Sequence, residues 1–153
     1  MSKRFRPGIV SISDAVYKDE ASNKIVIAGL YSGNIVTEGG PSDLRFALYA
    51  EFFVPDAEEH DLDIQFWVGK RQVGGARSQV KADDPSLPLA IMLSQFSLGV
   101  GGATLPATLR IKAVLDAGNP LIVLEKKIIP RNPTATASPP LAARSRRVAR
   151  AKA

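Results

Sequence analysis

The densest group of side chains able to do chemistry occupies one short stretch of the chain. It consists of Asp56, Glu58, Glu59, His60, Asp61 and Asp63. Carboxylates together with an imidazole are the ligands that hard and borderline divalent metal ions prefer. The spacing fits neither an EF-hand loop nor an HExxH helix, which needs two histidines where this chain has one. We therefore expect a solvated loop between Phe53 and Leu62, and the alternative is a metal site formed by Asp56, Glu58, His60 and Asp61.

His60 is also the only candidate general base, because the chain holds no other histidine. Nucleophilic catalysis needs such a base beside an oriented hydroxyl and an acid. The chain has no cysteine to form a thiolate and no GxSxG turn to present a serine. The glycines at 99, 101 and 102 are not followed by Lys-Ser or Lys-Thr, so they do not predict a phosphate loop. We expect a non-catalytic protein with no cofactor and no small-molecule substrate.

Basic side chains gather at both ends of the chain and are candidates for binding an anionic partner. The formal net charge is +5, yet all 15 acidic residues lie between positions 9 and 130. Blocks of like charge repel one another and attract surfaces of the opposite charge. We expect an acidic protein surface or a neighbouring subunit as the partner, with nucleic acid as the alternative, in which Phe5 would stack on a base. The candidate partner-binding residues are Lys3, Arg4, Arg6, Arg144, Arg146, Arg147, Arg150 and Lys152.

Between these basic ends the sequence consists of short apolar segments separated by turn residues, which predicts an all-β fold. In the clearest segment, every second residue from Leu62 to Val68 is apolar, so Trp67 is placed on the outer face. Gly29 inside another segment predicts a bulge or a bend. The spacing predicts an antiparallel two-sheet sandwich of about 7–8 strands. The candidate strands are residues 9–17, 24–36, 44–54, 62–68, 72–81, 91–98, 109–115 and 121–129.

Three regions follow from this pattern: a basic N-terminal arm (1–8), the sandwich (9–130) and a basic extended tail (131–153). The tail is rich in Pro, Ala and Arg, and its prolines oppose both helix and central strand. The N-terminus lacks the apolar run of a signal peptide, and the longest apolar stretch is too short to span a membrane. The absence of cysteine suits a reducing compartment. We expect a soluble protein of the cytoplasm or of a virion, without a membrane partner.

The stretch from residue 13 to residue 31 carries a further pattern, formed by Asp14, Asp19, Lys24, Gly29 and Tyr31. It resembles the opening of an uncharacterised family of small bacterial and phage β-sandwich proteins. Residues 116–120 resemble a DxxGxP element that precedes the last strand of that family, and Ser13 stands where the family often has a cysteine. The resemblance covers about residues 9–129 and implies the sandwich fold. It implies no chemistry, because none is established for the family.

The expected molecule is thus a rigid sandwich with two basic arms and no assembled catalytic site. This shape suits a structural or adaptor protein that assembles with other proteins or with itself, for example in a phage virion. A nucleic-acid-associated accessory protein, binding through its basic tail, is the alternative function. A metal-dependent hydrolase centred on residues 56–63 is a third and less favoured one.

Overall fold

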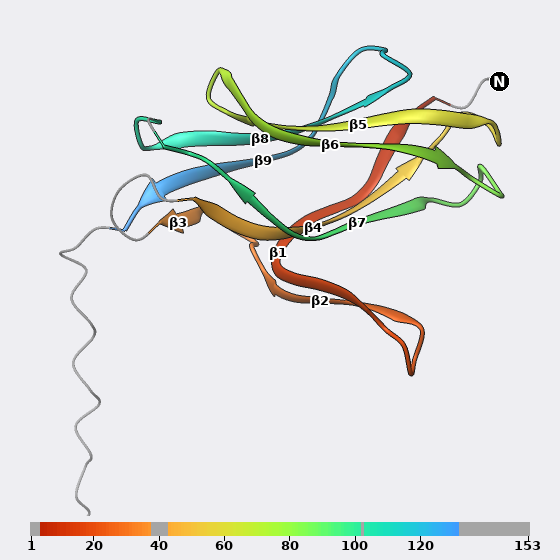
Figure 1. The fold of residues 1–153 in the computed structure, drawn as a ribbon, viewed down its shortest axis with the longest axis horizontal. Coiled ribbons are helices and arrows are strands. Elements are labelled where there is room, and N and C mark those ends of the chain that lie inside the picture. Colours follow the sequence, from red (N-terminus) through yellow and green to blue (C-terminus); the bar gives the residue numbers. More distant parts are fainter. Residues whose placement is uncertain (1–3, 38–42, 102, 132–153) are drawn as a thin grey trace, which may run out of the picture.

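The computed structural model describes residues 4–37, 43–101 and 103–131. Within these ranges the chain forms nine β-strands and no helix (Figure 1), so the predicted all-β class is confirmed. It follows that none of the described residues belongs to a helix long and apolar enough to cross a membrane. The strands are β1 (Arg6–Asp19), β2 (Lys24–Leu30), β3 (Ile35–Thr37), β4 (Leu44–Phe53), β5 (Glu59–Val68), β6 (Arg71–Lys81), β7 (Leu89–Leu98), β8 (Ala107–Leu115) and β9 (Leu121–Pro130).

The strands are arranged in two sheets. The four-stranded sheet has the order β2-β1-β4-β7 and is antiparallel throughout. The five-stranded sheet has the order β3-β9-β8-β5-β6, in which β3 runs parallel to β9. The prediction of purely antiparallel pairing is therefore wrong at this edge. The reason is that the segment predicted as one strand, residues 24–36, divides into β2 and β3, and its second part pairs with the other sheet.

The inner faces of the two sheets contribute side chains to one hydrophobic core. Phe66 on β5 has its ring centroid 6.4 Å from that of Phe46 on β4 and 4.5 Å from that of Phe96 on β7. Alternate residues of β5 are buried as predicted, and Trp67 lies on the opposite face, where Lys112 Nζ is 4.2 Å from its ring centroid. Contacts between aromatic rings of the two sheets therefore fix how the sheets pack.

The second half of β1 and the whole of β2 form a hairpin that projects from the body of the molecule (Figure 1). Gly29 has a φ of +69°, which favours glycine, and a Cβ at this position would overlap the Asp14 carboxylate. The same carboxylate accepts a hydrogen bond from the Tyr31 hydroxyl, with 2.8 Å between the oxygens. At the tip, Asp19 accepts hydrogen bonds from backbone N–H groups of the turn, including that of Ser22. The sequence predicted a bulge or a bend at Gly29, and the structure has a left-handed residue there within a strand whose pairing register is unbroken. The motif residues Asp14, Asp19, Gly29 and Tyr31 lie in or next to the hairpin.

Candidate functional site

The single histidine is buried in the structure, although the sequence favoured an exposed position in a solvated loop. Strand β5 begins at Glu59, so His60 is a strand residue that pairs with Val80 of β6. Its exposed fraction is 7%. The solvated loop predicted up to Leu62 is thus confined to residues 54–58, because the backbone of residues 59–61 pairs with β6.

Two carboxylates hold the imidazole of His60 on opposite sides of the ring. Nδ1 lies 2.7 Å from Asp116 Oδ2, and Nε2 lies 3.0 Å from Asp56 Oδ1. Both ring nitrogens carry a hydrogen in the imidazolium form, which is the form able to donate to both carboxylates at once. Asp56 comes from the turn between β4 and β5, and Asp116 from the turn after β8. The group of His60, Asp56 and Asp116, which we call the His60 clamp, therefore ties three segments together.

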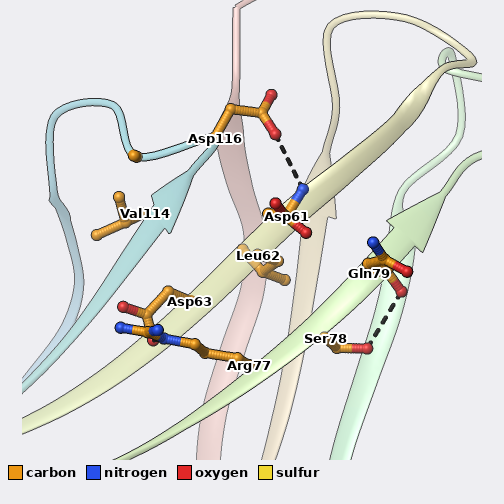
Figure 2. Close-up of a pocket in the computed structure, with 9 residues that line it drawn as sticks. Asp61, Leu62, Asp63, Arg77, Ser78, Gln79, Val114 and Asp116 are labelled. Carbon is orange, nitrogen blue, oxygen red and sulfur yellow. Dashed lines mark hydrogen bonds and ion pairs between the residues drawn. The ribbon is translucent and has the colours of Figure 1, made fainter.

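Asp116 is held in place by the backbone of β5. Its Oδ1 accepts a hydrogen bond from the Asp61 N–H at 2.9 Å, and its own N–H donates to the Asp61 carbonyl oxygen at 2.9 Å. Figure 2 shows its side chain close to the Asp61 backbone. Its φ of +50° is left-handed, a region that aspartate enters more readily than most residues. Local backbone bonding thus aims this carboxylate at the imidazole.

The electrostatics of the clamp favour the charged ring. Burial lowers the pKa of His60, but the hydrogen bonds and negative charges of Asp116 and Asp56 raise it more, so the pKa lies above its usual value of 6.5. The hydrogen bond from His60 and the one from the Asp61 N–H lower the pKa of Asp116 below 3.8. Each partner therefore stabilises the charged state of the other.

The clamp occupies the groups that a metal ion or a catalytic base would need. Both imidazole nitrogens lie at hydrogen-bond distance from carboxylate oxygens, and the two carboxylates lie on opposite sides of the ring. Glu58 donates its backbone N–H to Asp56 Oδ1 at 2.9 Å, and Asp61 takes part through its backbone. In residues 4–37, 43–101 and 103–131, no three acidic or histidine side chains converge to hold a metal ion. The predicted ligands thus form a hydrogen-bond network that joins turns and strands.

A hollow of about 730 Å³ opens beside the clamp, over β6, β5 and the end of β8. Figure 2 shows Asp61, Asp63 and Asp116 at this surface together with Arg77. Arg77 Nε lies 3.4 Å from Asp63 Oδ1, so part of the negative charge is neutralised within the hollow. Because the nearby imidazole is engaged on both nitrogens, it does not offer a free base to a molecule in this hollow.

Sequence reasoning missed Asp116 as a member of the site. It lies 56 residues from His60 along the chain, and its one local signal was its place in the turn of residues 116–120.

No protein-family model and no curated protein matches this chain. The resemblance carried by that turn and by residues 13–31 therefore stays a prediction, while the geometry gives these residues a structural role.

The predicted basic arms lie largely outside the described residues, which exclude Lys3 and the tail positions Arg144, Arg146, Arg147, Arg150 and Lys152. At the N-terminus the structure corrects the expected arm. Strand β1 begins at Arg6, whose guanidinium lies 3.6 Å from the ring centroid of Phe53. Phe5 stacks on Phe52 with 5.4 Å between centroids. Phe5 therefore packs against the core and is not placed to stack on a base.

Proposed function

We propose that this protein is a non-catalytic structural or adaptor β-sandwich that assembles with copies of itself and with other proteins, as a phage virion component does. The observation that carries the proposal is the projecting hairpin of β1 and β2, whose apolar side chains face solvent. Tyr17 is 52% exposed and Leu30 57% exposed. Several exposed apolar side chains on one projecting element favour an interaction site.

Strand β2 of the hairpin pairs with β1 along one edge, and its other edge is the open edge of the four-stranded sheet. A two-stranded hairpin is marginally stable in water unless it packs against something else. Near its base, Val16 forms a small cluster with Ala47 and Tyr49, separate from the main core. Strand β2 lies at the sheet edge, where it pairs with β1. A partner that covers the exposed side chains would stabilise the hairpin, which supports a role in assembly.

The charge distribution also supports assembly. The turns after β4, β6 and β8 lie at one end of the molecule and carry Asp56, Asp83 and Asp116. Strand β9 ends at the opposite end (Figure 1), and the basic tail follows it in the sequence. A tail with this charge is attracted to an acidic end of a neighbouring molecule. The proposed contacts are thus an apolar one through the hairpin and an electrostatic one through the tail.

Sedimentation velocity of the full chain tests the proposal. We expect species larger than a monomer, in a proportion that rises with protein concentration. Because apolar contacts are insensitive to moderate salt and exposed charge pairs are screened, added salt should weaken the association without abolishing it. A monomer at every concentration and salt level would contradict the proposal.

A nucleic-acid-associated accessory function is the second candidate, favoured by the tail, which contains no acidic residue between positions 131 and 153. We would titrate a labelled random DNA duplex by fluorescence anisotropy at several salt concentrations. If six phosphates are neutralised, the logarithm of the affinity should fall against the logarithm of salt with a slope of about −5. The control is a full chain with Arg144, Arg146, Arg147, Arg150 and Lys152 replaced by Gln, which should lose most of that slope. Equal binding by both chains would exclude the tail as the DNA-binding element.

A further inference from the structure

The four-stranded sheet ends in two edge strands that lack the usual protection against pairing. Natural edge strands are shortened or carry charges, because their unpaired backbone groups otherwise pair with another chain. In the five-stranded sheet, β3 has three residues, and β6 carries Arg71, Arg77 and Lys81. Strand β7, in contrast, has ten residues and none of them is charged, while β2 has Lys24 as its single charge. The four-stranded sheet is therefore the one open to pairing at its edges.

A groove lined by both apolar and polar side chains runs beside the edge of β7. It consists of two adjoining hollows of about 590 and 370 Å³ between β6 and β7, the edge strands of opposite sheets. Ile91, Leu93 and Phe96 line it from β7. On the β6 side the groove is lined by Gly74, where an added Cβ would lie 3.0 Å from Leu98 Cδ2. Gly74 therefore packs closely against Leu98 at this wall of the groove, where a larger residue would have to displace the leucine side chain.

The N-terminal half of β7 offers a regular edge for pairing. Residues Leu89–Leu93 pair with β4 without interruption, and a bulge follows, where two residues of β7 lie opposite Ala47. An added strand meets five consecutive residues in one register before that bulge. Its side chains alternate between the two faces, so every second one would point into the groove.

Strand β2 of a second molecule has the properties that this edge and groove require. It has seven residues, and Ile25 and Ile27, two positions apart, project on one face and are 38% and 37% exposed. Its hairpin projects from the body (Figure 1), so it can reach another molecule before the two bodies meet. Strand β7 carries no charge, and β2 carries a single lysine at its start. Pairing the two strands therefore brings no like charges opposite one another.

We propose that β2 of one molecule pairs with β7 of a second copy of this chain and inserts Ile25 and Ile27 into the groove between β6 and β7. The inference rests on the proposed assembly function and names its partner. Because β2 and β7 are opposite edges of the same sheet, each molecule uses one edge as donor and the other as acceptor. Such a head-to-tail contact repeats from molecule to molecule and produces a ring or a filament.

Two charge-bearing variants and their mixture test this contact. The donor variant carries Ile25→Lys and Ile27→Lys on β2. The acceptor variant carries Ala90→Lys and Met92→Lys on β7, at two positions that line the groove. At a salt concentration high enough to screen the electrostatic contact of the tail, each variant alone should be monomeric in sedimentation velocity. Mixed in equal amounts, they should form a one-to-one heterodimer and nothing larger, because one intact donor meets one intact acceptor. The matched control, Val36→Lys with Ile122→Lys, adds two lysines at exposed apolar positions of the five-stranded sheet and should assemble as the wild type does.

The other outcomes separate failure of this contact from failure of the assembly function. If both variants assemble like the wild type, the contact is wrong and the assembly function stands. If the donor variant dimerises and the acceptor variant does not, β7 pairs with its own copy across a two-fold axis, which overturns the head-to-tail contact. If the wild type is itself monomeric, both proposals fail. Circular dichroism of each variant establishes that it is folded, so a monomeric result reports on the contact.

Discussion

Phe66→Ala is expected to lower the free energy of unfolding by about 3–5 kcal/mol. The side chain is 2% exposed, and its ring lies against Phe46 and Phe96 of the opposite sheet. Removing it takes away apolar contact with both sheets at once. The cavity left behind closes only in part, because its walls are hydrogen-bonded strands. Chemical denaturation of wild type and variant, with linear extrapolation to water, measures the difference.

Phe53→Ala is the matched control for this prediction. It removes the same ring from β4, but from the face opposite Phe52, where the ring is half-buried beneath the Arg6 guanidinium. Its loss removes surface packing and a cation–π contact but opens no core cavity. We therefore expect Phe53→Ala to lower the free energy of unfolding by about 1 kcal/mol. Equal destabilisation by the two variants would mean that Phe66 is not the junction between the sheets.

The strands were predictable because alternation and turn residues are local signals. The buried and exposed positions of β5 follow the alternation of its sequence. The ends were less predictable, since they depend on distant partners. Strand β1 begins at Arg6 because that residue pairs with Phe53, and nothing near Arg6 in the sequence indicates this pairing.

The division of residues 24–36 into two strands had a partial signal. Gly29 indicated a bend, and the structure has a left-handed φ there. The destination of the following residues was not predictable, because Ile35 pairs with Ile128 in the other sheet, and only the assembled fold brings them together. A three-residue parallel edge strand is set by tertiary contacts and leaves no periodicity to detect.

The sequence predicted which residue types gather around His60, but it did not predict that His60 is buried. Five carboxylates surround His60 in the sequence from residue 56 to residue 63, and high local charge indicated exposure. The structure buries the ring because Asp56 and Asp116 satisfy both of its nitrogens, and a buried charge is tolerated when it is paired and hydrogen-bonded. Asp116 could not be identified as the second partner without knowing that β8 lies beside β5.

The assembly proposal depends on whether an apolar strand lies at the centre or at the edge of a sheet, which sequence patterns alone do not show. The segment of β7 is apolar in the sequence, and an apolar segment equally fits a central strand. Its position at a sheet edge, beside a groove, is what makes the absence of charge informative. The same holds for Ile25 and Ile27, which the sequence placed in a candidate strand and which lie, partly exposed, on β2 of the projecting hairpin (Figure 1).

His60→Ala is expected to lower the free energy of unfolding by about 2 kcal/mol near pH 6, and the loss should shrink as the pH rises. The folded-state pKa of His60 lies above the usual 6.5, so the clamp's contribution is fully present below 6.5 and is lost as the pH rises through the folded-state value. The pKa of Asp116 is lowered, so its contribution is present above 3.8 and is lost as the pH falls through its own folded-state value. The free energies of unfolding of variant and wild type should therefore differ most at pH values between the folded-state pKa of Asp116 and that of His60.

Two measurements separate this pH effect from simple loss of packing. In thermal unfolding, the difference in melting temperature between wild type and variant should become smaller as the pH rises. The difference that remains at alkaline pH is the part caused by the loss of the ring's packing contacts. Because the chain has one histidine, NMR titration of its ring protons reports its pKa without assignment. Asp116→Asn keeps the side-chain shape but removes the charge, so the pKa of His60 should fall in this variant. An unchanged pKa there would show that the contact with Asp116 does not stabilise the imidazolium, and Asp116 would then have no role in the pH dependence of folding.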